Sequence, residues 1–297
     1  MLDFRIATFL KLCETKSYTK TAKILEITQP SVTQHIKYLQ NRYQCKLFSY
    51  EGKTLRLTPE GEYLRRHAKA MSQNSEKIIA DLQRMSAKRV TYRFGCMKEF
   101  GDRLVPKIVG RMLAQNEDLE LELYSDNAKK LVEMLQCGQL DFVLVDKSFM
   151  NVDVVATPLA SEPFSIWASP EHAEELKNHT FRKIFREKLL LREEGAGSRA
   201  ALEEILESRR YDLNDFYATM VSNTPSSLTA LTAENTGICF NYESVMKDEA
   251  ERGRIAKVAV SDFSASRDLV FLHLKDNVNA SQFKSFFATF KEQWNNR

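Results

Sequence analysis

The chain has 297 residues, 43% of them hydrophobic and 28% charged, which is the balance of a globular protein of two or three domains. It has no apolar run of about 18 residues and its first residues continue into an amphipathic pattern, so we expect no membrane span, no signal peptide and a cytoplasmic location. Its five cysteines are scattered without a CxxC pair or a Cys/His cluster, which predicts reduced thiols, no metal site and no cofactor.

The net charge of +3 conceals an uneven distribution along the chain. Residues 1–90 hold 17 lysines and arginines against 8 acidic residues, a net of +9, whereas the remainder carries a net of −6. A basic segment attached to an acidic body indicates a polyanion as the partner of the first part and a different task for the second.

Three short helices are predicted within the first 45 residues. The apolar face of the first helix runs from Leu2 to Cys13. Ser17 is a suitable N-cap for the second helix, and Thr28 for the third. Pro30 falls in the first turn of the third helix, where its missing N–H removes no intrahelical hydrogen bond. The proline therefore marks a helix start.

The third helix has two unlike faces. Val32, Ile36 and Leu39 face inward, whereas the other face carries Gln, Ser, Thr and Lys. This is a helix-turn-helix pattern, in which the second helix lies in the major groove, with glutamines toward adenine edges and lysines toward phosphates. The alternative is an ordinary solvated helix face. The predicted DNA contacts of these helices are Ser17, Thr19, Thr28, Gln29, Pro30, Ser31, Thr33, Gln34 and Lys37.

A β-hairpin is predicted over residues 46–58, since two short strands flank Glu51-Gly52-Lys53. A basic hairpin beside a helix-turn-helix is a wing, which reaches the flanking phosphates or the minor groove. Lys53 and Arg56 are its predicted DNA contacts, although Lys53 could equally be a solvated turn residue.

Six separated motifs lie in order within residues 2–61. They are Phe9-Leu10, residues 17–25, Thr28-Gln-Pro-Ser-Val-Thr33, Ile36-Lys-Tyr-Leu39, Leu47-Phe48 and Leu57-Thr-Pro-Glu-Gly61. Together they resemble the DNA-binding domain of LysR-type transcriptional regulators, which implies an all-α winged helix-turn-helix at residues 1–58 and sequence-specific binding of double-stranded promoter or operator DNA. The chain departs from the family's usual sequence at Gln40, at Tyr43-Gln44 and at Tyr50, where an expected wing arginine is lost.

A long linker helix is predicted over residues 59–89. From Leu64 to Met85, apolar residues and Ser75 recur at alternating steps of four and three without an intervening Gly or Pro, which gives a heptad seam of about three repeats. A helix lying on its own domain is the alternative. The resemblance implies a homodimer that presents two recognition helices to a two-fold DNA site, and a homotetramer stays open. The expected dimer seam is Leu64, Ala68, Met71, Ile78, Leu82 and Met85.

Strands and helices alternate over residues 90–297, which predicts βαβ units and mainly parallel sheets. The expected strands are residues 90–95, 119–124, 140–145, 164–168, 237–240, 255–260 and 268–274, and the expected helices are 104–115, 128–136, 171–177, 198–208 and 279–294. Two α/β lobes with a cleft between them result. Lobe I is about residues 90–160 and 267–297, and lobe II about residues 161–266.

This half also resembles the LysR family, most clearly in the helix-Gly-x-Leu-Asp-strand pattern of residues 128–145 and in Gly197-Ser-Arg199. The resemblance implies a periplasmic-binding-protein-like domain that holds a small-molecule effector between its lobes. Ligands of open α/β sheets bind beyond the carboxyl ends of strands, and the hydroxyls, amides and helix N-termini there favour an anionic metabolite such as a carboxylate. Each such residue could instead only cap a helix. The expected effector contacts are Lys98, Glu99, Phe100, Ser125, Asp146, Ser198, Arg199, Asn223 and Thr224.

No catalytic motif is present, since the chain lacks a P-loop, GxSxG, HExxH and Rossmann pattern, so we expect no enzyme. A solute-binding protein is one alternative, opposed by the basic first 90 residues. An enzyme with an accessory DNA-binding domain is another, opposed by the lack of a nucleophile, base or metal constellation. Regulators of this family imply RNA polymerase as a further partner, and the single lobe II cysteine, Cys239, argues against a peroxide-sensing cysteine pair.

Overall fold

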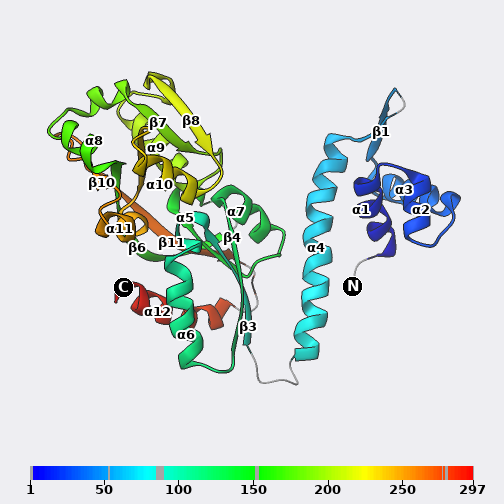
Figure 1. The fold of residues 1–297 in the computed structure, drawn as a ribbon. Coiled ribbons are helices and arrows are strands. Elements are labelled where there is room, and N and C mark those ends of the chain that lie inside the picture. Colours follow the sequence, from blue (N-terminus) through cyan, green and yellow to red (C-terminus); the bar gives the residue numbers. More distant parts are fainter. Residues whose placement is uncertain are drawn as a thin grey trace. The chain divides into compact units, whose positions relative to one another are not determined.

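Figure 1 shows a computed structural model of the chain, which describes residues 3–52, 54–84, 90–150, 154–275, 277 and 280–296. The chain divides into two compact units, one containing residues 1–89 and the other containing residues 90–135 and 140–297. Buried apolar residues form a separate core in each unit, so each unit is held together by its own hydrophobic contacts.

The first unit, among its described residues, consists of short helices, a hairpin and one long helix (Figure 1). These elements are α1 (Phe4–Thr15), α2 (Tyr18–Ile24), α3 (Gln29–Tyr43), β1 (Phe48–Glu51), β2 (Thr54–Leu57) and α4 (Pro59–Arg84). The two strands pair antiparallel, with Phe48 opposite Leu57. The element order confirms the predicted winged helix-turn-helix followed by a long helix.

Hydroxyl side chains fix the starts of α2 and α3, as predicted. Ser17 Oγ accepts a hydrogen bond from the N–H of Lys20 at 3.3 Å, and Thr28 Oγ1 accepts one from the N–H of Ser31 at 3.3 Å. Each bond satisfies an N–H that has no partner within the helix. Pro30 lies in the first turn of α3, which continues unbroken beyond it, so the proline begins the helix.

A close backbone contact joins the hairpin to α4. A Cβ atom on Gly61 would lie 2.1 Å from the carbonyl oxygen of Leu47, so no other residue allows α4 to approach the chain this closely. Thr58 Oγ1 donates to the carbonyl of Lys46 at 2.6 Å and accepts from the N–H of Gly61 at 3.0 Å. The first turn of α4 is therefore fixed to the base of the wing.

The predicted seam of α4 divides into two parts. Ala68 is buried and Leu64 half-buried, and both pack into the core of the first unit. Their own unit covers Ala68 fully and Leu64 in part, and the intermolecular seam stays a prediction. Met71 and Ile78 are 57% and 60% exposed and are open to a second copy. Met85 and the side chain of Leu82 lie outside the described residues.

A mixed nine-stranded sheet forms the second unit across its described residues. In order across the sheet the strands are β4 (Leu119–Asp126), β3 (Val90–Met97), β5 (Phe142–Asp146), β11 (Ser266–Leu274), β6 (Val154–Ala168), β9 (Ile238–Tyr242), β7 (Lys188–Arg192) and β8 (Ala218–Ser222), with β10 (Ala256–Lys257) paired to β6. β3 is parallel to β4 and β5, and β7 is parallel to β8 and β9. β6 and β11 run antiparallel to their neighbours.

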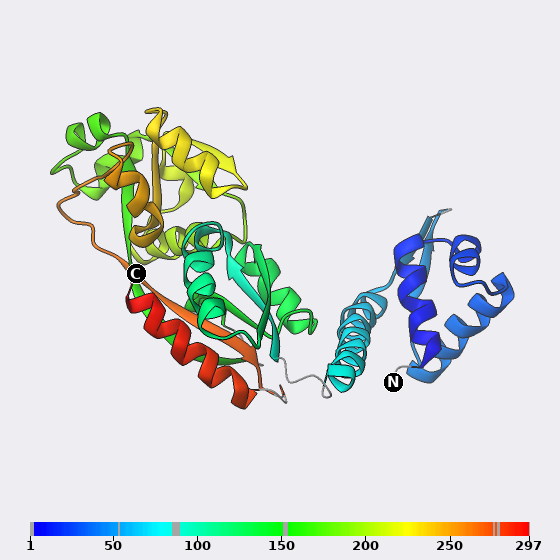
Figure 2. The ribbon, with the colours of Figure 1, turned by 60° about the horizontal axis from the view of Figure 1, so that its bottom comes forward.

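The long strand β6 passes from one lobe to the other (Figure 2). It pairs with β11 from Val154 to Pro163 and then with β9 from Phe164 to Trp167. Lobe I carries α5 (Lys98–Gly101), α6 (Leu104–Gln115), α7 (Ala128–Gln136), η1 (Lys147–Phe149) and α12 (Ala280–Asn295). Lobe II carries α8 (Pro170–Glu175), η2 (Phe181–Arg186), α9 (Gly197–Ser208), η3 (Leu213–Asp215), α10 (Pro225–Ala233) and α11 (Glu243–Glu251). The predicted two-lobed α/β fold is confirmed.

Helices cover both faces of the lobe I sheet. On β3, the Phe94 ring lies 5.7 Å from that of Phe290 on α12. A Cβ on the next residue, Gly95, would lie 2.8 Å from the Leu131 side chain on α7. Successive strand residues point to opposite faces, so α12 and α7 lie on opposite sides of the sheet.

Several elements differ from the sequence prediction. β6 begins ten residues earlier than the predicted strand, and only two residues of the expected strand 255–260 pair, as β10. The pattern did not predict β7, β8, α10 or α11. β7 contains three successive leucines, which favour a helix as readily as a strand, and most of β8 is exposed, so neither shows the expected alternation. Asn279, the predicted start of the last helix, lies outside the described residues.

Candidate functional site

The exposed face of α3 carries five of the eleven predicted DNA contacts. Val32, Ile36 and Leu39 are buried against the rest of the first unit, which turns the opposite face of the helix outward. The exposed residues on that outward face are Gln29, Pro30, Thr33, Gln34 and Lys37. Helical periodicity therefore places these five side chains together, as the sequence predicted.

The polar side chains of this face are not equally available. Thr28 and Ser31 bind each other through their hydroxyls at 2.8 Å and maintain the cap. Thr33 Oγ1 donates to the carbonyl of Gln29 at 3.1 Å. Its methyl group and the acceptor lone pairs of its hydroxyl stay available to DNA. Among the described residues, the side-chain amides of Gln29 and Gln34 have no hydrogen-bond partner, so both can pair with an external donor and acceptor.

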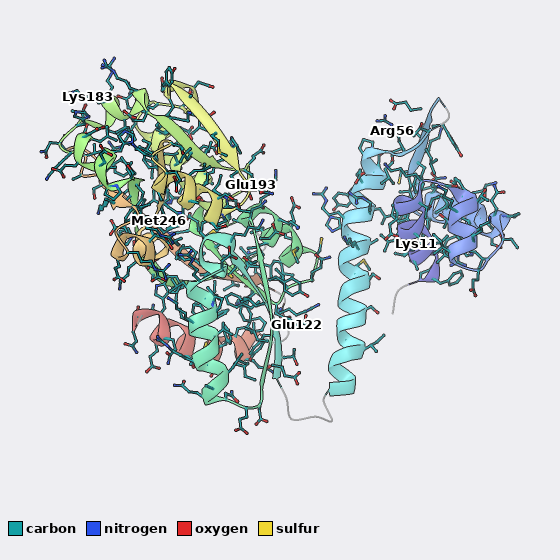
Figure 3. The ribbon with its side chains drawn as sticks, viewed as in Figure 1. Lys11, Arg56, Glu122, Lys183, Glu193 and Met246 are labelled. Atoms are coloured by element: carbon teal, nitrogen blue, oxygen red, sulfur yellow. The ribbon has the colours of Figure 1, made fainter. Side chains whose placement is uncertain are left out.

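The predicted DNA contacts on and before α2 and on the wing differ in their exposure and in their bonding partners. Thr19 on α2 is exposed and Ser17 is held by its cap. Arg56, labelled on the wing in Figure 3, forms an ion pair with Glu51 at 2.6 Å in which both side chains are well exposed. Such exposed pairs contribute little stability, so a phosphate can replace the glutamate. Lys53 lies outside the described residues.

In the second unit, Glu99 links the two lobes. It lies in α5 of lobe I, where its side chain is fully buried, and its Oε1 accepts hydrogen bonds from lobe II. The donors are Arg192 Nη1 at 3.0 Å, Ser198 Oγ at 2.9 Å and the N–H of Ser198 at 3.3 Å. Glu99 and Ser198 were predicted, whereas Arg192, at the end of β7, was not.

A second link joins the lobes around Asp146, which is fully buried at the end of β5. Its carboxylate accepts hydrogen bonds from Arg267 Nε at 3.0 Å and Nη2 at 2.8 Å, from Ser148, and from Tyr242 Oη at 3.3 Å. Arg267 Nη2 also binds Glu204 on α9 of lobe II at 2.5 Å. Both oxygens of Asp146 are thus bound by protein donors from the two lobes, and its predicted role as an effector contact stays a prediction.

Electrostatics around Asp146 agree with this structural role. Although burial disfavours the charged guanidinium, hydrogen bonds to Asp146 and Glu204 raise the pKa of Arg267. Burial, together with the nearby Asp146 and Glu99 carboxylates, raises the pKa of Tyr242 well above its usual range. Arg267 therefore stays charged and Tyr242 stays a neutral donor at any physiological pH.

The other predicted effector residues are held in different ways. Lys98 Nζ lies 3.5 Å from the carbonyl oxygen of Asn223 in lobe II and 4.0 Å from Asp126. Phe100 is buried, with its ring 4.9 Å from that of Tyr242. Arg199 binds Glu203 on its own helix at 2.8 Å, and is thereby occupied.

Two predicted hydroxyl residues serve local structure. Ser125 packs against α5, since a Cβ on Gly101 would lie 2.4 Å from its Oγ. Thr224 Oγ1 donates to Ser227 Oγ at 2.6 Å in the first turn of α10. Of the predicted effector residues, the structure therefore brings Glu99 and Ser198 together and brings Lys98 to Asn223. Asp146 and Phe100 both contact Tyr242 of the other lobe, whereas Ser125, Arg199 and Thr224 make local contacts.

Comparison with known proteins decides the family. Residues 5–62 match the family model described as bacterial regulatory helix-turn-helix protein, lysR family, and residues 87–295 match the model described as LysR substrate binding domain. The chain belongs to the LysR family of transcriptional regulators. It is accordingly a DNA-binding transcriptional regulator with an effector-binding domain, and not an enzyme.

Individual relatives align with this LysR-type regulator over nearly its full length. The HTH-type transcriptional regulator MJ0300 of Methanocaldococcus jannaschii is 25% identical over 283 residues, which is 94% of this chain and 95% of the relative. The structure of ArgP from Mycobacterium tuberculosis has a TM-score of 0.69 at 17% identity and covers 99% of this chain and 97% of its own. A hydrogen-peroxide-bound OxyR mutant from Corynebacterium glutamicum has a TM-score of 0.63 at 18% identity, with 99% and 92% covered.

The described part of this LysR-type regulator offers neither a membrane-spanning helix nor a metal-ligand cluster. No helix there combines the length and the apolar character that a membrane span requires. The same residues do not bring three or more His, Cys, Asp or Glu side chains together as metal ligands.

Proposed function

We propose that the outward face of α3 reads base sequence in the major groove. Gln29, Thr33 and Gln34 meet base edges, Pro30 meets a thymine methyl group, and Lys37 holds a phosphate. Arg56 and Lys53 reach the flanking backbone from the wing. Support for the base-reading role comes from one observation above all: in a helix held by its buried face, Gln29 and Gln34 are exposed and have no hydrogen-bond partner among the described residues.

The linker helix α4 pairs two copies of the regulator through its exposed apolar residues. Met71, Ile78 and Ile79 are all largely exposed, and a soluble helix rarely leaves several large apolar residues in water without a partner. A homodimer built in this way presents two copies of α3 to a two-fold operator in the cytoplasm. Further pairing to a homotetramer and contact with RNA polymerase are part of the same proposal.

The effector is a small anion that binds between the lobes near Glu99 and Ser198. The site is supported by its chemistry, since an arginine, a hydroxyl and the N-terminal turn of α9 converge there on one carboxylate. Effector binding changes the contacts between the lobes and hence the arrangement of the recognition helices. Such coupling requires that the effector bind the two arrangements with different affinity.

Gln29→Ala tests the base-reading role. We expect it to lower affinity for sites selected from random-sequence duplexes by about 1–3 kcal/mol, roughly 5- to 150-fold, with little change on random DNA. Lys37→Gln should weaken both DNAs and reduce the slope of log affinity against log salt by about 1. Asn41→Ala, an exposed change at the other end of α3, is the control. Equal losses for Gln29→Ala on both DNAs would overturn the role.

A further inference from the structure

The buried cluster of Glu99, Arg192 and Ser198 has the form of an occupied carboxylate-binding site. We propose that Glu99 is an intramolecular ligand: its carboxylate fills an anion site formed by Arg192, Ser198 and the first turn of α9, and a small carboxylate competes with it for that site. This inference rests on the proposed effector function of the second unit and adds to it the ligand's charged group and the protein group that it displaces.

The donors belong to lobe II and the carboxylate to lobe I. Arg192 ends β7, Ser198 lies in the first turn of the twelve-residue helix α9, and Glu99 reaches them from α5. All three donor groups bind the same oxygen, Oε1, at 2.9 to 3.3 Å. A buried guanidinium, a hydroxyl and a helix N-terminal N–H that meet at one point are the groups that bind an anion in proteins.

The other oxygen of Glu99 is left without a partner. Oε2 is buried and has no hydrogen bond to any described residue. A buried acceptor that makes no hydrogen bond costs free energy, so the site satisfies the Glu99 carboxylate only in part. A free carboxylate is not restrained by a backbone and can turn so that its two oxygens share the three donors. Replacement of Glu99 by an external carboxylate therefore removes the free-energy cost of the unpaired oxygen.

Arg192 does not depend on Glu99 for charge compensation. Its Nε and Nη2 bind the two carboxylate oxygens of Glu193, at 2.8 Å and 3.1 Å, in a bidentate pair. Glu193, labelled in Figure 3, is the residue that follows β7. Glu99 is therefore the second carboxylate on one guanidinium and is held by a single contact to it. Its departure leaves Arg192 paired, so release does not strand a buried charge.

Release of Glu99 removes a hydrogen-bonded contact between the lobes. Ligand exchange therefore changes how the lobes are held together.

The space at the site limits the ligand's size. A Cβ on Gly197 would lie 2.3 Å from Met97 Sδ, so the surroundings are closely packed. The group that replaces Glu99 is consequently a carboxylate on a short chain. To displace Glu99, an effector needs additional affinity. It gains this affinity when its other chemical groups contact residues elsewhere between the lobes.

Chemical rescue of Glu99→Ala tests the proposal in the full chain. The substitution removes the carboxylate and leaves its donors in place, and we expect the Tm to fall by roughly 5–10 °C. Acetate or propionate at about 50 mM should restore about half of this loss, because a ligand of the folded state raises stability. The wild-type protein should respond little, since its own carboxylate competes at high effective concentration. Adding Ser198→Ala to Glu99→Ala should weaken the rescue.

Matched controls separate a carboxylate site from a cavity or a salt effect. Chloride at the same ionic strength and neutral propionamide should give no rescue. If Glu99→Ala does not fold in chloride, the yield of refolded protein in acetate against chloride is measured instead. Equal responses to propionate and propionamide, equal shifts in wild type and variant, or no rescue of the folded variant would each overturn the proposal. These readouts need no DNA, so rescue that leaves DNA affinity unchanged would count against the proposed effector function alone.

Discussion

The two units use polar side chains in opposite ways. On α3, Gln29 and Gln34 are exposed and have no partner among the described residues, whereas between the lobes Glu99 and Arg192 are buried and bound to each other. In the DNA-free protein, water solvates exposed polar groups at little cost in free energy. Buried charged groups must be paired. The first arrangement therefore suits recognition of an outside polymer, and the second suits a contact that changes only when a ligand replaces it.

The largest effect is expected where a buried charge loses its partner. Asp146→Asn keeps the shape of the side chain but removes the charge opposite Arg267, and we expect a loss of about 3 kcal/mol in the free energy of unfolding. Urea denaturation followed by tryptophan fluorescence reports this unit, because Trp167 and Trp294, the chain's two tryptophans, both lie in it.

Asp268→Asn is the matched control for that measurement. Asp268 pairs with Lys147 at 3.8 Å, but the two side chains are 57% and 61% exposed. The free energy of unfolding should change by no more than about 0.5 kcal/mol. Similar losses for the two variants would break the distinction between buried and exposed pairs.

An intermediate effect is expected on α4, where exposure indicates a partner. Ile78→Lys should weaken association of two copies by roughly 10- to 100-fold, because each copy loses a buried apolar side chain in the dimer. The Tm of the isolated chain should hardly change, since Ile78 is 60% exposed there. Sedimentation equilibrium measures the dissociation constant. Ile24→Lys, at an isoleucine 57% exposed on α2, is the control, and an equal loss of association would contradict the seam.

The smallest effect is expected from oxidant on Cys239. Burial raises the pKa of the Cys239 thiol to about 11. At pH 8 only about one thiol in a thousand is then thiolate, the form that reacts with peroxide or iodoacetamide. Native protein should show almost no modification of Cys239 by mass spectrometry, whereas urea-denatured protein should be fully modified. Rapid reaction in the native state would show that burial does not protect this thiol.

The sequence predicted the first unit well because its determinants are local. Caps such as Thr28, the proline at a helix start and the spacing of Val32, Ile36 and Leu39 all act within one or two helical turns. The seam of α4 was the exception. Its spacing identified an apolar stripe, but the stripe alone does not say which part packs on α1 and which part stays exposed.

The sites between the lobes were predicted only in part because their partners are distant in sequence. Arg192 is 93 residues from Glu99, and Arg267 is 121 residues from Asp146. The carboxyl-end rule for α/β sheets selected Glu99, Asp146 and Ser198, which end strands or begin helices. It missed Arg192 because the strand that this residue ends, β7, was not predicted, and it missed Arg267 because this residue lies at the start of β11.

The glycine contact at the start of α4 determines how this regulator can be recombined. Because Gly61 seats α4 on the carbonyl of Leu47, and Ala68 fills the core beneath, the first turns of α4 cannot be exchanged apart from the helix-turn-helix. A chimera that joins residues 1–58 to the linker helix and effector-binding domain of another regulator would expose that core. A chimera that keeps the whole of α4 would transfer the DNA-binding domain intact, together with a helix about 39 Å long.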